Sequence, residues 1–165
     1  VPASAIRDGL RAFEPAGHRI ADVGTVAGVR YVDDSKATNC HAAQTSLMAY
    51  ERVVWIAGGL AKGQQFDDLV RATAGQMTGV VLLGADRAVI ADAIARHAPD
   101  LPIVEVSRTD TGAMAEVVAA AAAMAGPGGT VLLAPGCASW DMFRDYAQRG
   151  DMFAEAVKSL AQEGT

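Results

Sequence analysis

Two short polar segments carry most of the residue types that could do chemistry in this sequence. Residues 33–39 (DDSKATN) combine carboxylates, a lysine, a threonine and an asparagine, and residues 134–141 (APGCASWD) add a serine and an aspartate. Each segment follows an apolar run that predicts a buried strand, and each leads toward a predicted helix. In an open α/β sheet, this junction exposes side chains at the strand end and free N–H groups at the helix start. The two segments therefore predict a site for a polar, anionic ligand.

A third segment, residues 58–63 (GGLAKG), places glycines and a lysine directly after another apolar run. Glycine allows the backbone to approach a ligand closely, so this segment also suits a binding site. It is not a Walker phosphate loop, because Gln64 stands where that motif requires lysine, and it lacks the GxGxxG pattern. Lys62 is either a solvated surface cation or a ligand-binding one, and its place at the carboxyl end of a strand favours binding.

Lys36 and Ser139 each have a structural and a functional interpretation. Thr38 or Asn39 could cap the next helix without any ligand, but a cap does not require Lys36. A cation at the start of a helix suits a phosphate or a carboxylate. Ser139 is predicted either to cap a new helix or to offer its hydroxyl to the ligand.

The residues after Ser139 are expected to be mainly structural. We expect Trp140, Phe143 and Tyr146 to lie mostly in the core, with a last helix from about Asp151. Two arginines, Arg144 and Arg149, are expected to form ion pairs with nearby carboxylates, namely Asp141, Asp145 or Asp151.

Composition limits the class of protein. The chain has 165 residues, 51% of them hydrophobic, and a net charge of −5, which indicates one folded domain and argues against a nucleic-acid partner. Cys40 and Cys137 lack a CxxC or Cys/His spacing and are expected to be reduced thiols, and no histidine pattern predicts a metal site. There is no signal-peptide pattern, and the apolar run 117–125 is too short to insert into a membrane, so we expect a cytoplasmic protein.

Strands and helices alternate along most of the chain. A first helix is predicted at residues 3–13, followed by a hairpin at 18–26 and 29–32. Further strands are predicted at 52–57, 79–83, 102–106 and 130–134, and helices at 39–50, 66–74, 86–98 and 111–125. This order predicts an α/β fold with a six-stranded, mostly parallel sheet, one antiparallel edge strand and helices on both faces.

The three segments, together with residues 148–153 (QRGDMF), resemble the C-terminal domain of the Mur ligases. The resemblance extends from about His18 to the last helix, and the DSKATN string is similar to the branch that uses D-glutamate. It implies a Rossmann-like fold and one C-terminal, amino-acid-binding domain over residues 1–165. The N-terminal UDP-binding and central ATP-binding domains of such ligases would then be absent, and this chain alone would be inactive.

The resemblance also implies a reaction and its participants. In this family, ATP converts a carboxylate of UDP-N-acetylmuramoyl-L-alanine to an acyl phosphate, which the amine of D-glutamate attacks. ATP and Mg²⁺ would be bound mainly by the central domain, and the protein is expected to be a monomer. Thr38, Lys62 and Ser139 would hold D-glutamate, and Trp140 and Tyr146 would line its pocket.

The ATP side of the site would come from a second group of residues once the domain closes. By resemblance these residues are Arg19, Asp34, Lys36 and Asn39, and Lys36 is the candidate catalytic residue. Two alternatives stay open. One is a free-standing Rossmann-like oxidoreductase, against which the missing GxGxxG pattern argues. The other is a nucleotide- or small-ligand-binding module of the same fold that is not an enzyme.

Overall fold

The computed structural model describes residues 17–164, so the predicted helix at residues 3–13 lies outside the described part. Six strands form one sheet in the order β1-β2-β6-β3-β4-β5. Their bounds are β1 (Ala21–Val26), β2 (Val29–Asp33), β3 (Val53–Gly58), β4 (Met77–Leu83), β5 (Ile103–Glu105) and β6 (Thr130–Leu133). β1 pairs antiparallel with β2, and all other neighbouring pairs are parallel.

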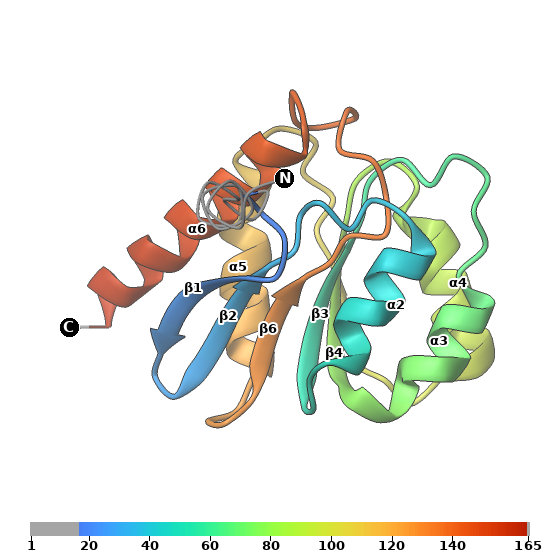
Figure 1. The fold of residues 1–165 in the computed structure, drawn as a ribbon, viewed down its shortest axis with the longest axis horizontal. Coiled ribbons are helices and arrows are strands. Elements are labelled where there is room, and N and C mark those ends of the chain that lie inside the picture. The colour runs from blue at the N-terminus through green and yellow to red at the C-terminus, as the bar shows by residue number, and fades with distance from the viewer. Residues whose placement is uncertain (1–16, 165) are drawn as a thin grey trace, which may run out of the picture.

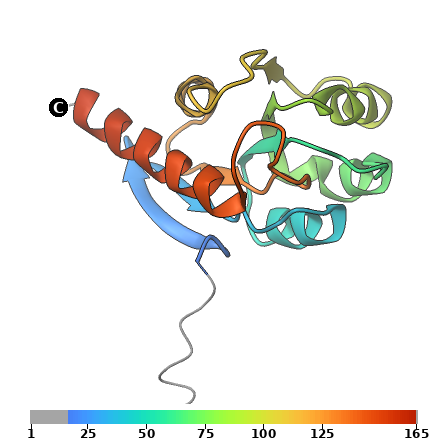
Figure 2. The ribbon, with the colours of Figure 1, turned by 90° about the horizontal axis from the view of Figure 1, so that it is seen from above.

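Helices cover both faces of the sheet (Figures 1 and 2). α2 (Cys40–Met48), α3 (Asp67–Thr73) and α4 (Arg87–His97) lie on one face, and the short 3₁₀ helix η1 (Ala74–Gln76) leads into β4. α5 (Ala113–Met124) and α6 (Tyr146–Glu163) lie on the other face. The chain moves in one direction across the sheet from β2 to β5 and returns to β6, so right-handed crossovers place α5 opposite to α2, α3 and α4. The predicted fold is confirmed.

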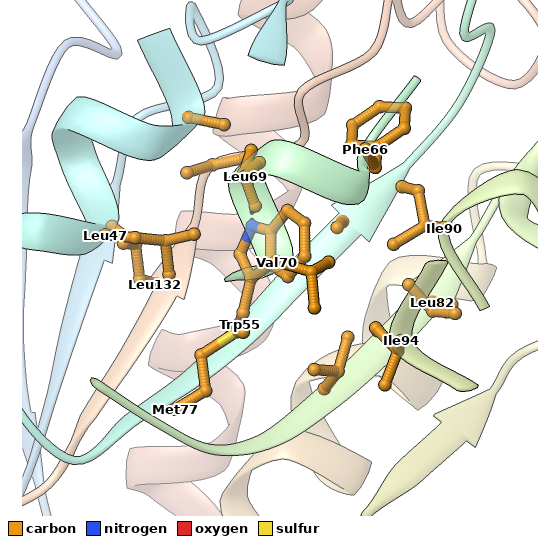
Figure 3. Close-up of a cluster of buried hydrophobic side chains, with 14 of the residues drawn as sticks. Leu47, Trp55, Phe66, Leu69, Val70, Met77, Leu82, Ile90, Ile94 and Leu132 are labelled. Carbon is orange, nitrogen blue, oxygen red and sulfur yellow. Dashed lines mark hydrogen bonds between the residues drawn. The ribbon is translucent and has the colours of Figure 1, made fainter. Parts of the chain in front are cut away.

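The central strands are apolar along their whole length because helices cover them on both sides. Every residue of β3 is buried, as expected for a parallel strand between two helical layers. Trp55 of β3 lies in the cluster beneath α2, α3 and α4, beside Leu132, Val70 and Met77 (Figure 3). Its indole Nε1–H donates to the Ala134 carbonyl at 2.7 Å, which ties β3 to the end of β6.

The hairpin and the last helix begin at different residues from those predicted. β1 starts at Ala21 rather than His18. α6 starts at Tyr146 rather than near Asp151, because the extended backbone of Asp145 lets its Oδ1 accept from Gln148 N at 2.8 Å. The prediction that Ser139 caps a helix is therefore wrong. The Ser139 carbonyl accepts from Met142 and Phe143 within a series of turns, and the helix forms only after the Asp145 cap.

Across residues 17–164, no helix is long and apolar enough to cross a membrane.

The indole hydrogen bond of Trp55 gives a test of the core. Trp55→Phe should lower the free energy of unfolding by about 2 kcal/mol, because it removes a buried hydrogen bond and leaves unfilled volume. Trp140→Phe is the matched control, since Trp140 is 64% exposed and its replacement should change stability little. Urea unfolding of this chain measures both. Equal effects at the two positions would contradict the assigned core.

Candidate functional site

The three predicted segments meet at one edge of the sheet. They follow β2, β3 and β6, which are adjacent parallel strands with β6 in the middle. Their carboxyl ends therefore point the same way, and the loops lie side by side at the top of Figure 1. This is the edge at which open α/β sheets bind ligands.

These loops enclose a pocket of about 310 Å³. It is lined by Thr38, Lys62, Ala138, Ser139, Trp140, Asp145 and Tyr146. The five residues that the resemblance assigned to D-glutamate thus line a single cavity. They supply one ammonium, two aliphatic hydroxyls and two aromatic rings, and Asp145 adds a carboxylate at the wall that also caps α6.

Lys62 and Trp140 form the exposed wall of this pocket. The Lys62 Nζ lies 4.1 Å from the centre of the Trp140 ring, within the range of a cation–π contact. Trp140 is 64% exposed, so the prediction that it lies mostly in the core is wrong. Phe143 is buried, as predicted, whereas Tyr146 is only half-buried and lines the pocket. Trp140 differs because its ring faces a charged side chain and solvent rather than an apolar layer.

The loop of Lys62 is joined directly to the loop of Ser139. Leu60 and Ala138 form an antiparallel bridge, with Leu60 N donating to Ala138 O at 2.9 Å and Ala138 N to Leu60 O at 3.0 Å. Gly59 permits this approach, because its φ is +136° and a Cβ there would lie 2.2 Å from the Ala138 oxygen. The bridge fixes Lys62 and Ser139 on neighbouring loops.

A second pocket of about 280 Å³ lies next to the first. Its lining residues are Arg19, Ile20, Asp34, Lys36, Ala37, Ala42, Thr45 and Ser46. Asp34 accepts from Ile20 N at 3.2 Å, and burial raises the pKa of its carboxyl. Lys36 lies between the two pockets, since its Nζ is 5.6 Å from the centre of the Tyr146 ring. Three of the four residues assigned to the ATP side therefore come together.

Asn39 is the fourth residue of that group and lines neither pocket. Its Oδ1 accepts from Ala42 N at 2.9 Å, so it is the N-cap of α2, the structural role that its position allowed.

Arg149 is a residue of the site that the sequence did not reveal. Its side chain is 1% exposed, and its Nε donates to Ser35 Oγ at 2.8 Å, its Nη2 to Ser35 O at 2.7 Å and its Nη1 to Cys137 O at 3.0 Å. The prediction that it pairs with a carboxylate is wrong, because its partners in the described residues are neutral oxygens. Burial lowers the pKa of the guanidinium to about 10. Arg144, in contrast, does pair with Asp145, at 3.5 Å.

His18 also joins parts of the site, and its sequence context gave no signal of this. Its Nδ1 lies 2.5 Å from Asp33 Oδ2 and its Nε2 lies 3.2 Å from Asp151 Oδ1. Its carbonyl accepts from Lys36 N at 3.1 Å. The start of the described chain is thereby attached to the loop of Lys36 and to α6.

Neither cysteine lines either pocket. Cys40 and Cys137 are both free thiols, as predicted, and burial raises the pKa of Cys137 to about 12. Within the described range 17–164, no group of three or more His, Cys, Asp or Glu side chains could hold a metal ion.

A larger hollow, about 510 Å³, lies elsewhere in the described part of the molecule. It is lined mostly by apolar residues from the β1–β2 hairpin and from the ends of α5 and α6. Its lining contains no lysine, arginine, serine or threonine.

Together, the fold and the pocket define a Rossmann-like α/β domain with a pocket of cationic and hydroxyl groups at the carboxyl edge of its sheet. The family described as "Mur ligase, glutamate ligase domain" matches residues 18–137, and the chain belongs to this family. The resemblance that the three segments predicted is confirmed.

Curated relatives agree with this assignment. A UDP-N-acetylmuramoylalanine–D-glutamate ligase of Streptomyces avermitilis is 64% identical over 160 residues, which cover 97% of this chain and 34% of that protein. The Thermobifida fusca protein of the same name is 60% identical over 161 residues, covering 98% and 35%. The one from Mycobacterium tuberculosis is 47% identical over 189 residues, covering 97% and 38%. The chain thus spans about a third of the length of these relatives.

A solved structure supports the fold. The crystal structure of UDP-N-acetylmuramate-alanine ligase MurC from Thermotoga maritima aligns with a TM-score of 0.55 at 14% identity, covering 94% of this chain and 36% of that one. At this identity, the likeness concerns the fold.

The hydrogen bonds of Arg149 can be tested without removing its charge. Arg149→Lys should lower the free energy of unfolding by about 2 kcal/mol, because one ammonium cannot reach the Ser35 and Cys137 oxygens together and leaves a buried acceptor unpaired. Arg144→Lys is the control, since Arg144 is exposed. Urea unfolding followed by circular dichroism compares the two. A chain with Arg149→Lys that is as stable as the control would refute this role.

Proposed function

We propose that this chain is the amino-acid-binding domain of an ATP-dependent ligase that adds D-glutamate to UDP-N-acetylmuramoyl-L-alanine in peptidoglycan synthesis. The names of the relatives, which are D-glutamate ligases at 47–64% identity, support the choice of reaction. The same proposal places the protein in the cytoplasm, where its nucleotide substrates would be available.

The observation that carries the proposal is the composition of the 310 Å³ pocket. A dicarboxylate amino acid needs positive charge and hydroxyl donors in a small space, and Lys62, Thr38 and Ser139 offer these groups from three different loops. The domain as a whole is acidic, with a net charge of −5, so attraction of such a ligand depends on local cations. The exposed ring of Trp140 and the ring of Tyr146 would contact the methylene groups between the carboxylates.

The reaction needs groups that this chain would not supply. ATP would activate the carboxylate of the acceptor as an acyl phosphate, and the amine of D-glutamate would displace phosphate from a tetrahedral intermediate. We propose that the remaining two thirds of the relatives' length corresponds to UDP-binding and ATP-binding domains that hold the acceptor, ATP and Mg²⁺.

The role of this domain would be to position and to stabilise charge. The pocket presents the amine of D-glutamate, while Lys36 and Arg19 in the adjacent pocket face the phosphates after closure. Lys36 lies between the pockets, where negative charge would develop as the acyl phosphate is attacked. Closure would also exclude water from the acyl phosphate. The isolated chain should therefore have no ligase activity.

Lys62→Ala tests the proposed binding role in the complete ligase. It should raise the KM for D-glutamate roughly 30-fold, the equivalent of about 2 kcal/mol for a charge-assisted hydrogen bond. The control is Lys158→Ala, because Lys158 is an exposed lysine on α6. Steady-state kinetics with varied D-glutamate gives both values. An unchanged KM in the Lys62 variant would argue for a different ligand or a binding module that is not an enzyme.

Lys36→Ala tests the charge-stabilising role. It should lower kcat of the complete ligase by about tenfold or more, because a cation is lost where charge develops in the transition state. The free energy of unfolding of this chain, measured in urea, should change little, since the Lys36 ammonium lies 5.6 Å from the centre of the Tyr146 ring and the substitution keeps the backbone bond to His18 O. If the substitution unfolds the domain instead, Lys36 is structural.

A further inference from the structure

We propose that Gln64 is a positioning residue that holds Lys62 in the pocket and fixes the three loops of the site relative to one another. This inference rests on the proposed function, since it concerns the residue that would bind D-glutamate. In the sequence, Gln64 stands where a Walker loop requires lysine. In the structure, its side-chain amide forms hydrogen bonds instead.

Lys62 is at the centre of a strained turn. Its φ is +50° and that of Gly63 is +78°, and Gln64 N donates to Ala61 O at 3.0 Å. Positive φ at both central residues is the pattern of a type I′ turn, which favours glycine or asparagine. A lysine in this conformation is strained and persists only where its surroundings fix it. The turn therefore needs anchors that do not involve the Lys62 side chain.

Both the nitrogen and the oxygen of the Gln64 side-chain amide form hydrogen bonds that can hold this turn in place. Its Nε2 donates to Ala61 O at 3.0 Å, so Gln64 closes the turn with its side chain as well as with its backbone. The same Nε2 donates to Gly136 O at 3.2 Å, and its Oε1 accepts from Cys40 N at 2.8 Å.

These bonds connect the three loops that carry the pocket residues. Gly136 belongs to the loop of Ser139, and Cys40 is the first residue of α2, directly after Thr38 and Asn39. One half-buried amide thus joins the backbones beside Thr38, Lys62 and Ser139. An amide is suited to this because it donates and accepts at the same time, whereas a lysine or a carboxylate could not satisfy both kinds of partner.

The loop has other attachments that should preserve the fold without Gln64. Asp86 accepts from Ala61 N at 2.8 Å through Oδ2, and its own N–H donates to Gly59 O at 2.9 Å. The Leu60–Ala138 bridge adds two further backbone bonds. Loss of the Gln64 amide should therefore displace the turn at Lys62 without detaching the segment, so the effect should appear in D-glutamate binding.

The test uses Gln64→Met in the complete ligase, which keeps the length of the side chain and removes its hydrogen bonds. It should raise the KM for D-glutamate about tenfold and leave the KM for ATP within about twofold. Gln65→Met is the control on the same loop, since Gln65 is exposed, and it should leave both constants unchanged. Gln64→Glu keeps the acceptor for Cys40 N but loses both donated bonds, so it gives a second measurement if the first variant folds poorly.

A double substitution separates positioning from a general structural effect. If Gln64 acts through Lys62, Gln64→Met should raise the KM for D-glutamate little further in a Lys62→Ala background. Equal rises in both backgrounds, or parallel rises in the KM for ATP and D-glutamate, would overturn the inference. If Lys62→Ala itself leaves the KM for D-glutamate unchanged, the proposed function fails. If Lys62→Ala raises it and both Gln64 variants do not, only the role of Gln64 fails.

Discussion

The buried guanidinium of Arg149 is the interaction on which the geometry of the site depends. It extends from α6 and bonds two loops, at Ser35 and at Cys137, that are far apart in sequence but follow neighbouring strands. Ser35 Oγ in turn donates to Tyr146 O at 2.7 Å. Because Tyr146 is the first residue of α6, this bond connects the loop of Ser35 to the start of the helix that carries Arg149. A cation buried among neutral oxygens is tolerated only if its donors are satisfied, so both loops must adopt the conformation that supplies those oxygens.

Anchored backbone and exposed side chains have separate roles in this domain. The loops are fixed beneath the pocket by Arg149, by the Leu60–Ala138 bridge and by the helix cap of Asn39. The groups proposed to meet the ligand lie above these anchors, and Lys62 is exposed with its ammonium against the Trp140 ring. A binding site gains from this arrangement because the anchors position the loops before the ligand arrives, which lowers the entropic cost of binding.

The sequence predicted the fold and the edge of the sheet at which the pocket residues lie, because both depend on local patterns. Apolar runs alternating with helical segments predict a parallel sheet, and polar residues such as Lys36 and Ser139 directly after those runs must lie at its carboxyl edge. The contacts of Arg149 could not be predicted, since its bond to Ser35 joins residues 114 positions apart and an arginine among aspartates suggests ion pairs. Trp140 was misassigned because hydrophobicity alone does not show that Lys62 would cover one face of its ring.

The central claim is that Lys62, Thr38 and Ser139 bind the two carboxylates of D-glutamate. A crystal structure of the complete ligase with D-glutamate tests it most directly. The account predicts carboxylate oxygens within about 3 Å of Lys62 Nζ, Thr38 Oγ1 and Ser139 Oγ. D-glutamate bound elsewhere, for example in the apolar hollow at the ends of α5 and α6, with these three groups left in solvent, would contradict it.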